Sequence, residues 1–145
     1  VLSMRSALFL PLLLLAGALH AAEDARQLAP MPAAAEANLR AEMRANLLAL
    51  NEILGLVAAG RLAEAGALAE KELGVSAMGK HRSQPFDARP GPHMAPAMHA
   101  MGMDGHQAAS AFARIAASGD RERTIAALPS LTAACVGCHY AYRIR

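Results

Sequence analysis

The sequence predicts an all-α fold, arranged as an antiparallel four-helix bundle, on the strength of three observations. Alanine, leucine, glutamate and arginine dominate residues 23–145, and all four favour helix. β-branched residues are scarce, and no stretch longer than a few residues alternates with the period of two that a half-buried strand needs. Apolar residues instead recur at steps of three and four along four segments, which places them on one face of each helix.

The first 22 residues are predicted to be a cleaved export signal. Met4 and Arg5 form a short positive region, an apolar run of about 13 residues extends from Ala7 to Leu19, and small residues continue to Ala22. A bilayer span needs about 20 apolar residues, so cleavage is favoured over stable membrane insertion. We therefore expect an exported protein, with residues 23–145 forming one domain.

The first helix is expected over residues 33–59, because Pro32 precedes this stretch and Gly60 follows it. Its apolar face follows steps of three and four and consists of Leu39, Met43, Leu47, Leu50, Leu54 and Val57. The short turn at Gly60 leads into a second helix over residues 61–73, which is therefore an antiparallel neighbour of the first.

Residues 74–92 connect the second helix to the third. They are rich in glycine, proline and serine and have no apolar periodicity, so we expect a flexible connection. The third helix is expected over residues 93–117. Its apolar positions alternate steps of four and three and are Met94, Met98, Met101, Gly105, Ala108, Phe112 and Ile115.

The fourth helix is expected to begin at Asp120, a residue type that caps helix N-termini. Its apolar seam is predicted to contain Ile125, Leu128, Thr132, Cys135, His139 and Tyr142. Pro129 interrupts this stretch, so a kink, or a short helix followed by a new start at Ser130, is expected.

The segment Cys135-Val136-Gly137-Cys138-His139 has the spacing Cys-x-x-Cys-His, which is the attachment signature of a c-type haem. On a helix, residues three and four apart share a face, so both thiols could bind one haem edge while the imidazole ligates the iron. A redox-active Cys-x-x-Cys pair, half of a zinc site and a disulfide are the alternatives. They are disfavoured because the chain has two cysteines only and no βαβ pattern. One haem c, covalent through Cys135 and Cys138 with His139 as iron ligand, is therefore predicted.

With Tyr142 and Arg143, the motif extends to Cys-x-x-Cys-His-x-x-Tyr-Arg near the C-terminus of an exported, helical chain. In this respect the sequence resembles the cytochrome c′ class, which are bacterial c-type cytochromes with a four-helix-bundle fold. The resemblance implies one of two forms. In one, a methionine of the first helix is the sixth iron ligand and the haem is a low-spin electron carrier; in the other, the iron is five-coordinate and binds NO or CO.

Met43 is the candidate for the sixth ligand, since it lies on the apolar face of the first helix and Met43-x-x-Asn46 resembles the low-spin members. A thioether ligates haem iron and raises its potential. Alternatively Met43 is a core residue, and Leu39 or Leu47 faces the iron and leaves it five-coordinate. Met94, Met98 and Met101 are further candidates, although packing around the ring is the more common role for such residues.

Arg143 follows His139 by four residues, so it is expected either to pair with a haem propionate or to complement the helix dipole as a solvated cation. Tyr142 is expected on the seam near the imidazole of His139. Arg40, one turn before Met43, is expected to pair with Glu36 on the helix surface rather than with a propionate.

Residues 81–106 concentrate histidine and methionine, both of which are copper ligands. His99, Met103 and His106 share a helix stripe, so a surface copper site is one interpretation. The other is that the methionines belong to the core and the histidines to a polar face.

The function expected from these patterns is that of a periplasmic monohaem electron carrier, which is not an enzyme and whose partners are redox proteins. The alternative is a five-coordinate cytochrome whose partners are gaseous ligands. Nucleic-acid binding is not expected, because basic runs are absent and aromatic residues make up only 3% of the chain. The resemblance also implies homodimers formed through the first two helices, which the Ala/Leu-rich faces permit.

Overall fold

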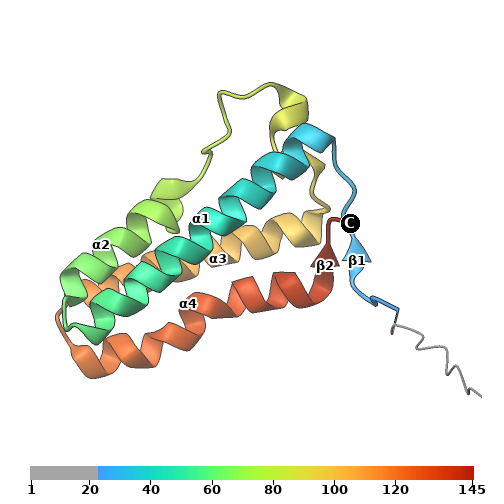
Figure 1. The fold of residues 1–145 in the computed structure, drawn as a ribbon. Helices are drawn as coiled ribbons and strands as arrows, with labels where there is room; N and C mark the ends of the chain where they lie inside the picture. Colours follow the sequence, from blue (N-terminus) through green and yellow to red (C-terminus); the bar gives the residue numbers. More distant parts are fainter. Residues whose placement is uncertain (1–22) are drawn as a thin grey trace, which may run out of the picture.

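The computed structural model describes residues 23–145, and the predicted export signal, residues 1–22, lies outside this range. The described part is all-α, as predicted. It contains four α-helices: α1 (Ala33–Ala58), α2 (Leu62–Glu72), α3 (Pro96–Ala117) and α4 (Arg121–Ala141). Two short strands, β1 (Gln27–Leu28) and β2 (Tyr142–Arg143), pair in parallel next to the end of α4 (Figure 1).

The turns between the helices lie where the sequence predicts them. Gly60 and Gly119 have φ of +75°, a left-handed conformation that glycine adopts without steric cost, and each lies between two consecutive helices. Asp120 caps α4, because its Oδ1 atom accepts a hydrogen bond of 3.0 Å from the backbone N–H of Arg123.

Two helix boundaries differ from the prediction. α3 begins at Pro96 rather than at residue 93, since proline suits the first helical turn and the residue before a proline is disfavoured in the helical conformation. The predicted new start at Ser130 is wrong: α4 continues through Pro129 as one helix. Figure 1 shows that α4 changes direction part-way along its length, as expected of a helix with an internal proline.

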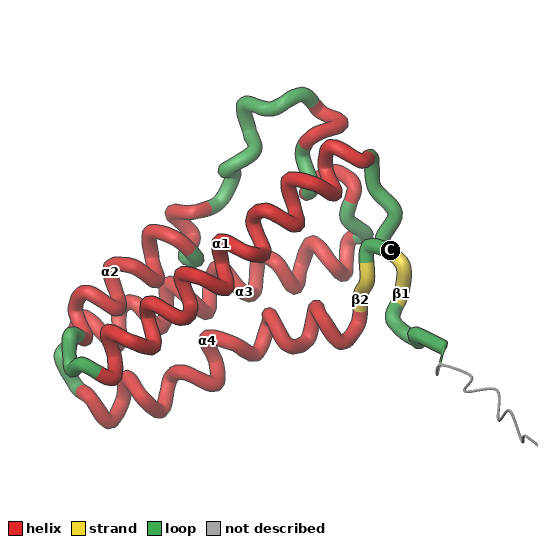
Figure 2. The backbone as a smooth tube through the Cα atoms, viewed as in Figure 1, coloured by secondary structure: helices red, strands yellow, loops and turns green. Residues whose placement is uncertain are grey.

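The connection between α2 and α3 contains three single-turn 3₁₀ helices: η1 (Val75–Ala77), η2 (Phe86–Ala88) and η3 (Gly91–His93). Two contacts attach it to the N-terminal half of α1. The Asn38 side chain donates to the Ala88 carbonyl at 2.7 Å, and His81 Nε2 lies 3.1 Å from Glu42 Oε2. Figure 2 shows this long, mostly non-helical segment passing from the end of α2 to the start of α3. Its flexibility stays a prediction.

The core consists of two separate apolar clusters. The larger one joins the C-terminal half of α1 to α2, α3 and α4 through Ile53, Phe112 and Leu131, among others. The smaller one contains Ala29, Leu39, Met98 and Tyr142 at the other end of the molecule. α1 packs on α2, α2 on α3 and α3 on α4, whereas α1 has few contacts with α4.

Candidate functional site

The three residues of the haem-attachment motif lie in the last two turns of α4. Cys135 and His139 are exposed, Cys138 is partly buried, and both cysteines are free thiols. Burial raises the pKa of the Cys138 thiol, and the neighbouring Cys135 raises it further. The motif is therefore helical and accessible, as a haem-attachment site requires.

The side of α4 that packs on α3 is not the predicted seam. Thr124 and Leu131 are its buried residues, and a Cβ atom on Gly105 of α3 would lie 3.5 Å from the Cβ of Ala134. Ile125 is 44% exposed, so its predicted burial is wrong. α4 is rotated so that small residues meet α3 and the predicted seam lies on a neighbouring side.

That neighbouring side, which we call the α4 stripe, contacts α1 at its first residue. Its members follow steps of four and three and are Arg121, Ile125, Leu128, Thr132, Cys135 and His139. Arg121 at the start of the stripe donates from Nη1 to the Val57 carbonyl near the end of α1, at 3.0 Å. Because residues at these steps share one side of a helix, Cys135 and His139 continue the side that begins at Arg121, beyond the internal Pro129.

A second side of α1, which we call the α1 stripe, is contacted by the chain beyond α4. It consists of Glu36, Arg40, Met43, Leu47, Leu50 and Leu54, again at steps of four and three. Glu36 accepts a hydrogen bond of 3.0 Å from Nε of Arg145, which follows α4 and β2. Three large apolar members remain substantially exposed: Met43 at 37%, Leu47 at 68% and Leu54 at 43%. Arginine contacts therefore join the two ends, while apolar members of the α1 stripe between them remain uncovered.

The two end contacts also define the register of α1 against α4. Arg121 lies level with Val57, and the Arg145–Glu36 contact at the other end makes the helices antiparallel. Met43 is fourteen residues before Val57 and Cys135 fourteen after Arg121, so both lie about 21 Å from the first contact at 1.5 Å per residue. By the same count His139 is level with Leu39. Because helical side chains tilt toward the N-terminus of their own helix, those of His139 and Met43 lean toward each other.

This arrangement fits a c-type haem through its donor set and its surroundings. Two thiols and an imidazole lie on one half-exposed helix end, level with Met43 and the Arg40–Glu36 ion pair of α1, and the exposed Leu47 lies one turn from Met43. A closed zinc site has no support, because residues 23–145 bring no group of three or more His, Cys, Asp or Glu side chains together. Of the described helices, only α4 has the length and apolar composition to cross a membrane, and little of its apolar window is buried.

Tyr142 and Arg143 lie beyond the end of α4, so the expectation that Tyr142 continues its seam is wrong. α4 ends at Ala141, and both residues belong to β2. Tyr142 is buried in the smaller cluster with Ala29 and Leu39. Arg143 Nε is buried, has no hydrogen-bond partner among residues 23–145, and lies 3.9 Å from Asp24 Oδ2. The extended backbone of β2, rather than helical spacing, determines where these two side chains lie.

The sequence analysis missed the strand pair that holds this end of α4. β1 pairs with β2 through Gln27 opposite Tyr142 and Leu28 opposite Arg143, and the N–H of Ala29 donates to the Arg143 carbonyl at 2.8 Å. Strands of two residues carry no alternation, so no periodic signal could have revealed them. The charged residues Asp24 and Arg26, next to β1, were the sequence feature that could have drawn attention to this segment.

Those charged residues form an ion pair beside the haem-attachment motif. Arg26 contacts Asp24 through two side-chain hydrogen bonds, at 2.9 and 2.7 Å, and Arg26 Nη1 also donates to the His139 carbonyl at 3.4 Å. The hydrogen bonds from Arg26 lower the pKa of Asp24 to about 2, and the more distant Arg143 charge adds to this shift.

The histidine- and methionine-rich segment divides between core and surface. Met98 is buried in the smaller cluster, and Met94 and Met101 pack against it. His106 Nδ1 donates to the carbonyls of Leu73 and Gly74, at 2.8 and 3.1 Å, which caps the C-terminus of α2. One member of the predicted copper stripe therefore has a structural partner.

Arg40 pairs with Glu36 on the surface of α1, at 2.9 Å, which confirms the predicted ion pair.

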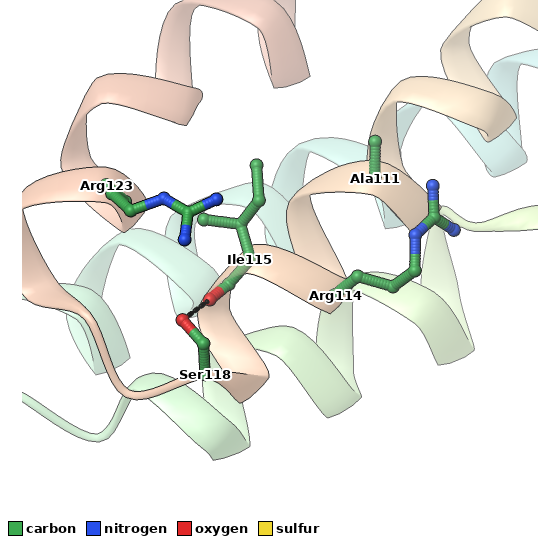
Figure 3. A pocket seen from close by; sticks show the side chains of 5 residues that line it. All are labelled: Ala111, Arg114, Ile115, Ser118 and Arg123. Carbon is green, nitrogen blue, oxygen red and sulfur yellow. Dashed lines mark hydrogen bonds between the residues drawn. The ribbon is translucent and has the colours of Figure 1, made fainter.

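A shallow groove lies between α3 and α4, away from the motif. Ala111, Arg114, Ile115, Ser118 and Arg123 line it (Figure 3). Arg123 is two residues after Arg121, about 200° round the helix, so the groove opens on a different side of α4 from the α4 stripe. Its lining contains no histidine, cysteine or carboxylate, and the Ser118 hydroxyl donates to the Ile115 carbonyl at 2.7 Å, so no base in the groove could activate it.

No protein-family model matches this chain, and no curated protein or solved structure is significantly similar to it.

Proposed function

We propose that this chain is a periplasmic c-type cytochrome with one haem attached through Cys135 and Cys138 and ligated by His139. The observation that carries the proposal is the helix end that presents Cys135 and His139 to solvent, with Cys138 beside them, together with the exposed apolar side chains Met43 and Leu47 on α1. We place the haem between the first and last helices of an antiparallel bundle. The resemblance to the cytochrome c′ class rests on the sequence from Cys135 to Arg143. A bound haem c would supply a one-electron couple and no substrate chemistry.

The residues of this chain then have distinct tasks. His139 would ligate the iron from α4, and Met43 would supply the sixth ligand, because it lies on the α1 stripe and its side chain leans toward the level of His139. Leu47, one helical turn from Met43, would exclude water from the same side of α1. The buried Nε of Arg143 has no hydrogen-bond partner among residues 23–145, so it could donate to a haem propionate. Tyr142 belongs to the smaller cluster, against which Cys138 of the motif packs.

A haem between the stripes also explains the composition of α4. Its length and apolar character suffice for a membrane span, yet few of its apolar side chains are buried in the fold. A haem, which is a large apolar ring, would cover the exposed apolar side chains of α4, so membrane insertion is not needed to account for them. We accordingly propose a protein that is released to the periplasm after removal of residues 1–22 and exchanges electrons with redox partner proteins.

A five-coordinate, gas-binding cytochrome is the second candidate, because Met43 is not level with His139. The residue of α1 at the level of His139 is Leu39, which is buried in the smaller cluster, and Met43 lies one helical turn further along, about 6 Å away. If Met43 does not reach the iron, the sixth position is left to NO or CO. Only one side chain distinguishes the two candidates.

The test is the optical spectrum of the matured protein, first oxidised and reduced, then reduced under CO. For the electron carrier we expect a sharp low-spin reduced spectrum that CO leaves unchanged, with a methionine-to-iron charge-transfer band in the oxidised form. Met43→Ala should abolish that band, and Met103→Ala, on a different side of α3 from the core methionines, should leave it intact. A broad high-spin spectrum that responds at once to CO would establish the gas-binding candidate instead.

Covalent attachment is tested separately. The mass of the mature chain should exceed that of the polypeptide by one haem, and Cys135→Ala with Cys138→Ala should remove this increment. An unmodified mass after expression with the haem-attachment machinery would contradict both candidates.

A further inference from the structure

We infer that residues 24–29 form a strap that positions the iron ligand His139, with Arg26 as the positioning residue. The inference rests on the proposed attachment of haem at His139, and it goes further by assigning a role to a segment outside the motif. Three contacts carry it: the pairing of β1 with β2, the hydrogen bond from Arg26 to His139, and the ion pair that holds Arg26.

The strand pair fixes the chain immediately after the motif. β2 begins directly where α4 ends, at Tyr142, and its partner β1 comes from the start of the described chain. Tyr142 and Arg143, which follow α4 directly, are held by their pairing with β1 and by the hydrogen bond from the Ala29 N–H to the Arg143 carbonyl. The C-terminal end of α4 therefore cannot shift freely along the helix axis. Ala29 and Tyr142 are both buried in the smaller cluster, so apolar packing reinforces the ladder.

The hydrogen bond from Arg26 acts on the ligand residue itself. The last four carbonyls of a helix have no intrahelical donor, and in α4 these include those of Cys138 and His139. The Tyr142 N–H donates to the Cys138 carbonyl, and Arg26 Nη1 donates to the His139 carbonyl at 3.4 Å. A guanidinium at a helix C-terminus is also favoured by the helix dipole. The final turn of α4 is therefore closed by a residue 113 positions away in sequence.

Arg26 is held in place for this role. Its two side-chain hydrogen bonds to Asp24 fix the guanidinium plane, and Asp24 Oδ2 lies 3.9 Å from Arg143 Nε on the neighbouring strand. A long side chain on the surface ordinarily samples many rotamers, so a bidentate carboxylate partner reduces the entropy lost when Arg26 reaches His139.

The experiment compares Arg26→Ala, Arg26→Lys and a matched control, Arg61→Ala. Arg61 is a similarly exposed arginine that also contacts a nearby carboxylate, Glu64, but lies at the start of α2. Amide hydrogen exchange of residues 138–145 is measured in the haem-free chain. Electron paramagnetic resonance of the oxidised, haem-loaded protein then reports the orientation of the axial imidazole through its g values.

We expect exchange in residues 138–145 to be about three- to ten-fold faster in Arg26→Ala, the effect of losing one charge-assisted contact at a helix end. We expect Arg26→Lys to restore most of the protection and Arg61→Ala to change nothing. The g values should shift in Arg26→Ala and return toward those of the unmodified protein in Arg26→Lys.

Unchanged exchange and unchanged g values in Arg26→Ala would overturn the inference. A mature chain that carries no haem would instead overturn the proposed function, and it would be recognised by mass before any variant is compared. The failure of the strap and the failure of the haem proposal are therefore distinguishable.

Discussion

The replacement of Leu47 by alanine offers a sharp test of where the haem lies, because its neighbour Leu48 is a matched control. Leu47 is 68% exposed and Leu48 59%, and neither belongs to the two apolar clusters. Leu47 is a member of the α1 stripe. Leu48 follows it by one residue, about 100° round the helix, and so points away from α4.

The expected magnitude follows from these exposures. Complete burial of a leucine side chain contributes about 1.5–3 kcal/mol, and about two-thirds of the Leu47 surface remains to be covered. Haem bound against the α1 stripe should therefore gain about 1–2 kcal/mol from Leu47 and almost nothing from Leu48. In the haem-free chain both substitutions should change the free energy of unfolding by similar small amounts, about 0.5 kcal/mol.

The assay is urea unfolding of both variants, each with and without covalently attached haem, followed by far-ultraviolet circular dichroism and haem absorbance. The free energy of unfolding is obtained for each variant with and without haem. The informative quantity is how much more stability Leu47→Ala loses than Leu48→Ala when haem is attached, after the same comparison in the haem-free chain is subtracted. Equal losses for Leu47→Ala and Leu48→Ala in the loaded protein would refute the placement of haem between α1 and α4.

Two further predictions concern the haem-free chain. Gly66→Ala should lower the free energy of unfolding by about 1–2 kcal/mol despite better helix propensity, because its Cβ would lie 2.7 Å from the Ala113 carbonyl oxygen. At Gly55 no atom lies within 4 Å of the new Cβ, so Gly55→Ala should raise the free energy of unfolding by about 0.5–1 kcal/mol. A lower free energy of unfolding in Gly55→Ala would show that the packing argument is wrong. The Asp24 carboxylate, whose pKa is lowered to about 2, stabilises the fold above its ordinary pKa of 3.8, and this contribution is lost as the pH falls toward 2. The free energy of unfolding should accordingly change less between pH 4 and pH 2 in Asp24→Asn than in the unmodified chain. Identical pH profiles of the two proteins would show that the Asp24–Arg26 contact does not contribute to the loss of stability at low pH.

Most of the helical framework was predictable because its signals are local. The proline before α1, the glycines between helices and the Asp120 cap act through backbone conformation within a few residues, and each lies where the sequence indicates. The start of α3 was placed three residues early because apolar periodicity alone ignores the effect of Pro96 on its neighbour.

The chemistry of the candidate site was likewise visible in the sequence. Thiols and an imidazole at spacings of three and four on a helix lie close together whatever surrounds them, so Cys135, Cys138 and His139 could be grouped without coordinates, and their binding of haem stays a prediction. The same helical spacing misplaced Tyr142, because it assumed that the helix continues past Ala141.

The sequence by itself determined that residues 23–145 are mostly helical, the bounds of the first two helices to within one residue, and which side chains could hold a haem. Tertiary structure decided which side of each helix is covered: α4 packs on α3 near Ala134 and leaves Ile125 and His139 exposed. It also brought Arg26 to the end of α4. Helix formation depends on neighbours within one or two turns, whereas helix rotation and strand pairing depend on residues far apart in sequence, and no local pattern encodes them.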